Sequence, residues 1–344
     1  MVTTAGRRLG CARRLLALVC SLPLLVGCGG FRFVIDAVPQ VDDLTETTVL
    51  ERVAPESGTR DGTVALIDVT GLIVDARPRT LIGRGENPVG SFVEALRRAE
   101  RDPNVRAVIV RINSPGGTVT ASDIMYRELK HFRETTGKPV VTLMGEVAAS
   151  GGYYLACAGD VVIAHPMTVT GSIGVVMQTI NFSEGMSRIG IRADAITSGP
   201  NKALASPFQP MPAEHRAILQ GLVNEFHDGF VAVVVESRPD LASDGLGRIT
   251  DGRVVSGMRA REVGLVDEVG DLRTAFAESM ERAGLGRARL VKYHRPLEHV
   301  GSAYAQTPVA AGTEVNLVQV KIPGAPGQIE GAGFYYLWDP TIVW

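Results

Sequence analysis

Residues 140–154 read VVTLMGEVAASGGYY, and this stretch holds the pattern that decides the fold. It begins with an apolar run, Val140 to Met144, which predicts a buried strand. It continues into the small residues Ala148-Ala149-Ser150-Gly151-Gly152, which predict a tight turn into a helix. A serine on such a turn presents its hydroxyl outward, and the glycines beside it let a substrate backbone approach closely.

The same pattern occurs once more, earlier in the chain. Val105 to Ile112 is a β-branched run that leads into the loop Asn113-Ser114-Pro115-Gly116-Gly117. Ala121 to Arg133 follows, with apolar residues at helical spacing. Strands that alternate with helices predict parallel strands, and functional groups collect at the carboxyl ends of such strands. Both glycine loops are therefore expected to face one site.

A lysine further along the chain adds a candidate base. Lys202 stands among small or apolar residues, and no acidic residue occurs between Asp194 and Glu214. A free lysine has a pKa of about 10.4, so it can accept a proton near neutral pH only if burial lowers that value. A nearby carboxylate would keep the lysine charged, and its absence favours the neutral amine. A serine, amide-rich loops and such a lysine are the groups that acyl transfer needs.

The order of these motifs resembles the signal peptide peptidase A (SppA) family, over about Thr63 to Met280. The motifs that carry the resemblance are Ser114-Pro115-Gly116-Gly117, the turn at Ser150, Thr170-Gly171-Ser172-Ile173-Gly174, Ser198-Gly199 before Lys202, Ser206-Pro207-Phe208, Asp251-Gly252-Arg253-Val254 and Gly264-Leu265-Val266-Asp267. The resemblance implies the α/β fold of the Clp protease/crotonase type, built of repeated β-β-α units with parallel strands.

The resemblance also implies a role for individual residues. Ser150 would be the nucleophile of a Ser/Lys dyad, Lys202 the general base, and Ser172 the residue that orients the lysine. The backbone amides of Gly117 and Gly151 would form the oxyanion hole. The chain would then be a serine endopeptidase that cleaves remnant signal peptides or other short apolar peptides through an acyl-enzyme. One departure is visible, because family members usually carry a polar or acidic residue after the lysine, where Ala203 stands here.

The amino-terminal residues predict export and attachment to a membrane. Basic residues precede an apolar stretch, Leu15 to Val26, that is too short to span a bilayer. Cys28 follows Gly27 where this stretch stops, which resembles a bacterial lipobox. We expect residues 1–27 to be removed as a lipoprotein signal peptide and Cys28 to carry lipid; an uncleaved short anchor is the alternative. Either way the catalytic part is expected in the bacterial cell envelope, outside the cytoplasm.

The remaining chain divides into three parts by composition. Residues 28–62 are polar and are expected to be a tether and entry segment, residues 63–293 the protease domain, and residues 294–344 a partly irregular extension. The extension contains the aromatic patch Phe334 to Trp338, which is expected to dock on the core, with a partner surface as the alternative. Ser91 to Arg101 predicts a helix with Ser91 as its cap. Pro212 to Glu236 carries an apolar stripe, which is most simply core, with a subunit contact as the alternative.

Composition excludes several other functions. The formal net charge of −2 gives no support to nucleic-acid binding. Of the four cysteines, Cys11 and Cys20 would leave with the signal and Cys28 would be modified, so no disulfide is expected and Cys157 is predicted to be a buried core residue. No spacing of Cys and His indicates a metal site, and no cofactor is predicted.

Two other readings of the sequence stay open. A crotonase-type acyl-CoA enzyme shares the implied fold, but it would not need Ser150 together with Lys202, and it would rarely meet CoA outside the cytoplasm. A catalytically idle scaffold at the membrane is the second. The resemblance implies that double-length relatives place the serine and the lysine in different halves of the chain. This chain carries one copy of each motif, so a ring-like homo-oligomer is expected. The spacing of Ser150 and Lys202 permits a dyad within one subunit or a shared one.

Overall fold

The computed structural model describes residues 44–54, 56, 58–77, 86–241, 243–295, 300, 302–305 and 333–338. All of them belong to one compact unit, Asp42–Trp344. The predicted signal peptide and Cys28, the predicted site of lipid attachment, lie outside the described residues, as does part of the predicted tether.

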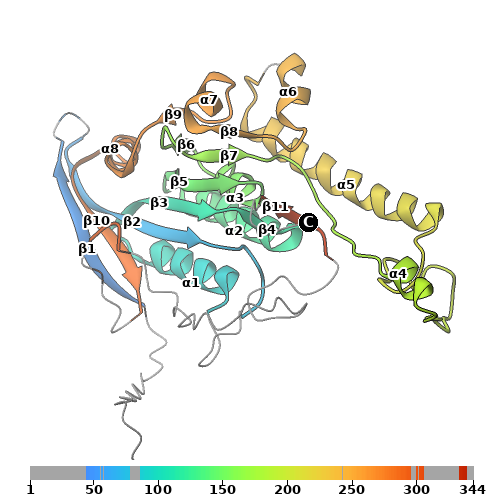
Figure 1. Ribbon diagram of the computed structural model, residues 1–344. Helices are drawn as coiled ribbons and strands as arrows, with labels where there is room; N and C mark the ends of the chain where they lie inside the picture. The colour runs from blue at the N-terminus through green and yellow to red at the C-terminus, as the bar shows by residue number, and fades with distance from the viewer. Residues whose placement is uncertain are drawn as a thin grey trace, which may run out of the picture. The chain divides into compact units, whose positions relative to one another are not determined.

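A nine-stranded sheet forms the centre of this unit (Figure 1). Its strand order is β1 (Thr45–Val53), β10 (Leu285–His294), β2 (Arg60–Thr70), β3 (Val105–Ser114), β5 (Val140–Ala149), β6 (Val161–Ala164) and β9 (Glu268–Val269), while β7 (Val169–Gly171) pairs with β5 and β8 (Val254–Ser256) pairs with β7. Within this sheet every pairing is parallel except β1 with β10 and β7 with β8. The predicted α/β class with parallel strands is confirmed.

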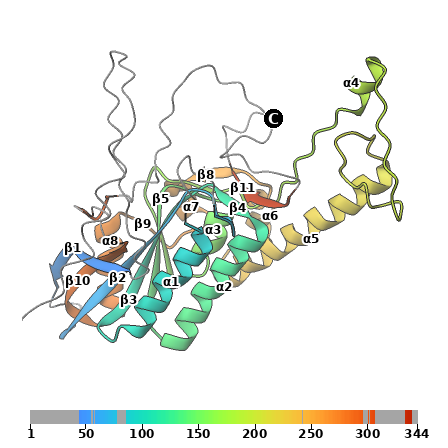
Figure 2. The ribbon, with the colours of Figure 1, turned by 90° about the horizontal axis from the view of Figure 1, so that it is seen from below.

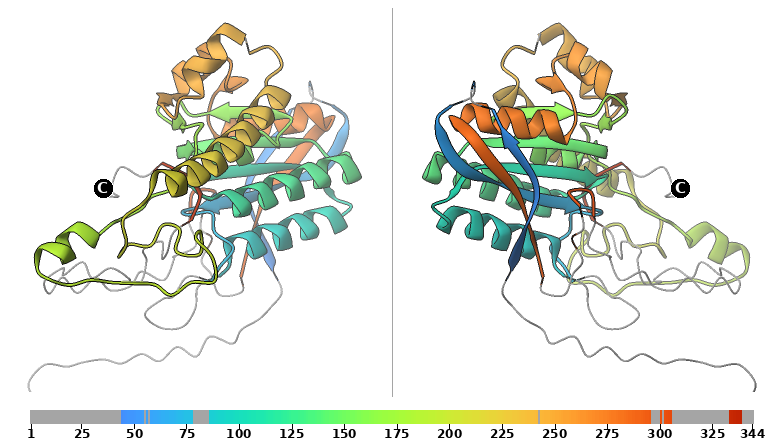
Figure 3. Two further views of the ribbon diagram at one scale, coloured as in Figure 1. Left: turned by 90° about the vertical axis from the view of Figure 1, so that its right-hand side faces the viewer. Right: turned by 90° about the vertical axis from the view of Figure 1, so that its left-hand side faces the viewer.

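Helices cover both faces of the sheet, as Figure 3 shows. Alternate residues of β2 explain this, because Ala65 and Ile67 belong to the core shared with α1 (Pro88–Arg101) and α2 (Val119–Thr136). Val64 and Leu66 point the other way, into the core shared with α8 (Leu272–Arg282). A sheet buried on both faces has near-continuous apolar strands, which is the pattern that made β3 and β5 visible in the sequence.

The start of α1 differs from the prediction. The helix begins at Pro88, and Asn87 caps it by accepting hydrogen bonds from Val89 N and Gly90 N. Ser91 lies inside the first turn, and its hydroxyl donates to Glu86 instead. A helix starts well where asparagine is the cap and proline takes the first helical position. These two residues determine the start of α1, and Ser91 does not.

The two glycine loops occupy equivalent places. After β3, the short strand β4 (Gly116–Thr118) leads directly into α2, so β3, β4 and α2 form a β-β-α unit. After β5, Ser150 leads directly into α3 (Gly151–Ala156). The partner of β4 is β11 (Tyr335–Leu337), which forms a separate two-stranded sheet with it. The carboxyl-terminal aromatic patch therefore docks on the core, as expected.

The segment between β7 and the end of α5 (Ala213–Ser237) is far more exposed than the rest. It includes α4 (Ser183–Arg188), which has no buried residue, and only Phe230 and Val234 of α5 are fully buried. Figure 2 shows α4 and the start of α5 lying away from the sheet. In the first half of α5 the stripe is only partly covered, because Leu219 and Leu222 are half-buried and Ile218 is exposed. The interpretation of the stripe as core therefore holds for Phe230 and Val234 but not for Ile218. Within the described residues, α5 alone is long and apolar enough to cross a membrane, by length and composition only. The chain continues through α6 (Ser243–Ile249) and α7 (Gly257–Glu262).

Candidate active site

Ser150 has a strained backbone at the end of β5. Its φ is 53° and its ψ is −115°, a conformation that costs a non-glycine residue about 1–3 kcal/mol. Two backbone hydrogen bonds hold it there: Ser150 N donates to the Gly171 carbonyl at 2.8 Å, and Tyr154 N donates to the Ser150 carbonyl at 2.8 Å. The neighbouring strand β7 and the first turn of α3 thus fix the orientation of the serine.

The side chain of Ser150 is buried and unpaired. The residue is 1% exposed, and among the described residues its Oγ finds no hydrogen-bond partner. A buried hydroxyl without a partner costs about 1–3 kcal/mol. A hydroxyl in this state is available to a base or to a bound substrate, and buried polar groups without partners gather at functional sites.

Parallel pairing of β3 with β5 brings the first glycine loop to this serine. Ser114 at the end of β3 pairs with Ala148, two residues before Ser150. A Cβ added to Gly116 would lie 2.7 Å from Gly151 N, and one added to Gly117 would lie 1.8 Å from the Ile73 carbonyl oxygen. The loop therefore has no room for larger residues. The two predicted oxyanion-hole glycines, Gly117 and Gly151, lie on the two segments that meet here.

Ser172 lies on the other side of the nucleophile. It follows Gly171, the residue whose carbonyl holds Ser150 N, and it also has a positive φ of 51°. Its own N–H donates to the Arg253 carbonyl at 2.7 Å. This contact indicates a structural role for the motif Asp251-Gly252-Arg253-Val254. The motif leads into β8 and supports the residues beside Ser150.

The turn before β8 is itself held by an ion pair between Asp251 and Arg253. Asp251 accepts hydrogen bonds from the side chain and the backbone N–H of Arg253. These bonds lower the pKa of Asp251 to about 2, so the carboxylate stays charged across the physiological range. The hydrogen bonds from Arg253 to this carboxylate therefore persist across that pH range.

Two further motif residues, Tyr153 and Asp267, make buried or half-buried tertiary contacts. Tyr153, which is fully buried in α3, donates its hydroxyl to the Leu265 carbonyl at 2.8 Å. Burial raises the pKa of Tyr153, so the phenol stays a neutral donor. Asp267 accepts from Val162 N and from the guanidinium of Arg238, which is largely buried. The stretch from Leu265 to Asp267 is one of the motifs that carry the family resemblance, but no local pattern in the sequence indicates the roles of Tyr153 and Arg238.

Lys202 is not brought to Ser150 within the chain. It is exposed, in the loop between α4 and α5, and its backbone N–H donates to the Gly199 carbonyl at 3.2 Å. No hydrogen bond in the described part of the chain joins it to Ser150. The structure therefore brings together Ser150, Ser172, Gly117 and Gly151, and leaves the proposed base apart from them.

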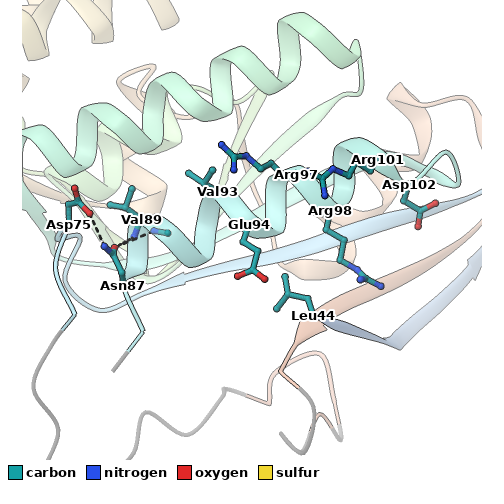
Figure 4. A pocket seen from close by; sticks show the side chains of 11 residues that line it. Leu44, Asp75, Asn87, Val89, Val93, Glu94, Arg97, Arg98, Arg101 and Asp102 are labelled. Atoms are coloured by element: carbon teal, nitrogen blue, oxygen red, sulfur yellow. Dashed lines mark hydrogen bonds between the residues drawn. The ribbon is translucent and has the colours of Figure 1, made fainter. Parts of the chain in front are cut away.

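Neither a pocket nor a metal site elsewhere in the described residues contains the predicted catalytic residues. A pocket of about 730 Å³ lies along α1 (Figure 4), and it is lined by Leu44, Asp75, Asn87, Val89, Gly90, Val93, Glu94, Arg97, Arg98, Arg101 and Asp102. No predicted catalytic residue lines it. Across the residues that the structure describes, no group of three or more His, Cys, Asp or Glu side chains is placed to hold a metal ion. Cys157 is buried as predicted, and burial raises the pKa of its thiol.

These features define an α/β protein of the Clp protease/crotonase type, with a serine on a strained turn beside two glycine loops. The model of peptidase family S49 matches residues 132–286. Putative protease slr0021 of Synechocystis sp. is 34% identical over 222 residues, which cover 64% of this chain and 75% of that protein. The chain therefore belongs to peptidase family S49, in agreement with the order of its motifs.

Two further relatives carry related names. A putative signal peptide peptidase SppA of Enterococcus faecium is 28% identical over 269 residues, which cover 78% of this chain and 76% of that protein. Protease 4 of Haemophilus influenzae is 35% identical over 221 residues, which cover 64% of this chain. The match spans only 34% of the length of that Protease 4.

Proposed function

We propose that this chain is a serine endopeptidase of the cell envelope, with Ser150 as nucleophile and Lys202 as general base. The observation that carries the proposal is the Ser150 hydroxyl, which is buried, unpaired among the described residues and held on a strained turn beside Gly117 and Gly151. Relatives named as proteases support the reaction class. The substrates that we propose are short apolar peptides, including remnant signal peptides.

Each group has the following proposed role. Ser150 Oγ attacks the peptide carbonyl while Lys202 takes the serine proton and later gives it to the leaving amine. The amides of Gly117 and Gly151 hold the negative oxygen of the tetrahedral intermediate, and each good donor contributes about 3 kcal/mol to the transition state. Water then releases the acyl group from Ser150. Ser172 is proposed to orient the lysine by a hydrogen bond.

We further propose that Lys202 serves the Ser150 of a neighbouring copy in a homo-oligomer. Lys202 is exposed, while Ser150 is buried and lacks a partner. The same exposed segment presents many large apolar side chains to solvent, which marks an association surface. These side chains are Ile180, Phe182, Ile189, Ile191, Ile196 and Phe208. A closed ring of identical subunits would bury them and complete every dyad.

Mixing inactive variants tests the dyad and its sharing together. Ser150→Ala and Lys202→Ala should each lower the rate of peptide hydrolysis, the lysine change by about 10²–10⁴-fold. Lys202→Arg is the matched control that keeps the charge but cannot accept a proton, and it should be equally impaired. If the dyad is shared, equal mixing of the two alanine variants should restore up to about a quarter of the activity, because random assembly completes that fraction of sites.

Four results would contradict parts of this proposal. Confirmed mixed oligomers without restored activity would place the dyad within one subunit. A serine-reactive fluorophosphonate that labels the Ser150→Ala chain as strongly as the unsubstituted chain would exclude Ser150 as nucleophile. A chain that neither hydrolyses peptides nor reacts with the probe would favour the idle scaffold, and hydrolysis of acyl-CoA alone would favour the crotonase-type enzyme.

The membrane attachment is tested at Cys28. We propose that Cys28 becomes the first residue of the mature protein and carries lipid. Cys28→Ser should abolish the lipid mass and release the catalytic part from the membrane fraction, as seen by mass spectrometry. Cys20→Ser is the matched control, because that residue lies in the segment that is proposed to be removed. An unmodified Cys28 in the membrane-bound chain would show that another device attaches it.

A further inference from the structure

The groove along α1 combines basic and apolar side chains (Figure 4). Arg97, Arg98 and Arg101 line it from the carboxyl-terminal half of the helix. Leu44 and Val93 also line it, and both pack against the hydrophobic core. A groove of about 730 Å³ with this lining suits a ligand that carries an anionic group next to an apolar one.

The acidic residues of the groove each have a hydrogen-bond donor of their own. Glu94 accepts two hydrogen bonds from the guanidinium of Arg295, at 2.9 and 2.5 Å. Asp75 accepts from the side-chain amide of Asn87 at 2.7 Å. Asp102 accepts from the backbone N–H two residues further along the chain at 2.8 Å. None of these carboxylates is bound to an arginine of α1.

Two of the three arginines are available to a ligand. Arg97 and Arg101 are exposed, and within the described residues they make no hydrogen bond and no ion pair. Arg98 lies 3.8 Å from the carboxylate of Glu46, and both side chains are more than a third exposed. A contact of this kind is worth at most about 1 kcal/mol, so it does not prevent Arg98 from contributing positive charge.

The arginines are not needed to satisfy the end of α1. The ammonium of Lys138 donates to the carbonyls of Ala99, Glu100 and Asp102, at 2.6, 3.1 and 2.9 Å. These carbonyls belong to the last turn, where a cation also complements the helix dipole. Lys138 already fills this role, which leaves the basic side of the groove without a structural function among the described contacts.

A buried phenol lies next to the basic side of the groove. The guanidinium carbon of Arg98 is 5.3 Å from the ring centroid of Tyr293. Tyr293 is 9% exposed, and its hydroxyl has no hydrogen-bond partner among the described residues. Burial raises the pKa of Tyr293, so the phenol stays neutral and adds no negative charge beside the arginines. Buried polar groups without protein partners are common at functional sites.

The groove is close in the sequence to the proposed membrane anchor. Leu44 lies 16 residues after Cys28, which is proposed to carry lipid. A chain of that length reaches at most about 55 Å when fully extended. In a lipidated chain the groove therefore stays within about that distance of the bilayer, where anionic phospholipids present phosphate groups joined to apolar chains.

We propose that the groove along α1 binds the headgroup of an anionic phospholipid. Arg97 and Arg101 hold the phosphate, because the planar guanidinium donates paired hydrogen bonds to phosphate oxygens. Leu44 and Val93 contact the glycerol and the first carbons of the acyl chains. A lipid bound here holds α1 against the bilayer, so the groove and the proposed lipid on Cys28 attach the domain at two points.

Calorimetric titration of the whole chain with a soluble phospholipid tests the site. The probe is dihexanoyl phosphatidylglycerol, used below the concentration at which it forms micelles. Arg97→Gln combined with Arg101→Gln should weaken binding at least about tenfold, because it removes charge-assisted hydrogen bonds to the phosphate. The matched control is Arg287→Gln combined with Arg289→Gln, which removes the same charge from two exposed residues of β10 outside the groove. It should change the affinity by less than about twofold.

Further soluble probes distinguish the lipid from other anions. Glycerol 3-phosphate lacks the acyl chains, and dihexanoyl phosphatidylcholine carries its own cation, so both should bind more weakly than the phosphatidylglycerol. Equal losses of affinity in the two double variants would overturn the site. Binding of glycerol 3-phosphate, or of an acidic peptide, as tight as that of the phosphatidylglycerol would overturn the assignment to a lipid. These probes need no anchor, so the result does not depend on whether Cys28 carries lipid.

Discussion

At Ser150 the geometry that suits catalysis opposes stability. The residue combines a positive φ with a buried Oγ that has no partner among the described residues. We expect Ser150→Ala to raise the free energy of unfolding slightly, because it removes an unpaired buried hydroxyl. We expect Ser150→Gly to raise it by about 1 kcal/mol more, because glycine adopts this backbone without strain. Urea denaturation of the three chains measures this, and a glycine variant less stable than the alanine variant would contradict it.

The site residues differ in how far sequence reasoning could reach them. Ser150, Gly117 and Gly151 were predictable together because they follow apolar strands, and parallel strands place such loops at one edge. Tyr153 could not be assigned a role, because its partner carbonyl on Leu265 lies 112 residues away. Nothing local in the sequence marks such a contact, which tertiary packing creates.

At the scale of the elements, one carboxylate links three neighbouring strands. Asp68 on β2 accepts two hydrogen bonds from Arg111 on β3, at 2.8 and 2.9 Å, and it lies 2.5 Å from the ammonium of Lys292 on β10. Lys292 is only 3% exposed and also donates to the Ala305 carbonyl. We expect Asp68→Ala to lower the free energy of unfolding by about 3–5 kcal/mol, because it leaves a buried cation without its carboxylate.

The control for this prediction lies on the same strand. Asp61 is exposed at the start of β2, so Asp61→Ala should change the stability by less than about 0.5 kcal/mol. Denaturant titration of both variants gives the comparison. Losses of the same size in the two variants would show that the three-strand link contributes nothing.

Elements with a strong local pattern were predictable and others were not. The apolar runs of β3 and β5 predicted buried strands because both faces of the sheet are covered. The short strands β4, β9 and β11 contain two or three residues each, which is too few to show a periodic pattern. The apolar stripe predicted the helix α5 correctly. The stripe alone does not determine whether the same chain or another copy covers the apolar face of the helix.

At the scale of the whole molecule, the exposed apolar side chains make the association testable. Ile196 is fully exposed and Ile189 is 72% exposed, so replacing both with aspartate should leave the folding of a subunit unchanged. If these side chains form the contact between copies, the double variant should sediment as a smaller species and lose activity. Met167→Asp is the control, because Met167 is 77% exposed outside this segment. Equal sedimentation of both variants would contradict the proposed contact.

The sequence could not choose between a dyad within one subunit and a shared one. The loop that carries Lys202 packs little against its own chain, and Gly185, Gly190 and Gly199 have open space around them. A segment with few contacts to its own chain would take its position in the proposed oligomer from contacts with a neighbouring copy. Contacts between copies involve residues scattered over a surface, so no local motif in the sequence indicates them.

The hydrogen bond from Ser150 N to the Gly171 carbonyl also bears on when the serine becomes competent during synthesis. Gly171 belongs to β7, which is paired on its other edge with β8, so residues up to Ser256 contribute to the turn at residue 150. A chain emerges from the ribosome amino terminus first, and β5 is therefore made well before β8. We expect a nascent chain to lack the fixed turn until those later strands have joined. The proposed nucleophile would then reach its fixed orientation only after residues that lie about 100 positions later in the sequence have been made.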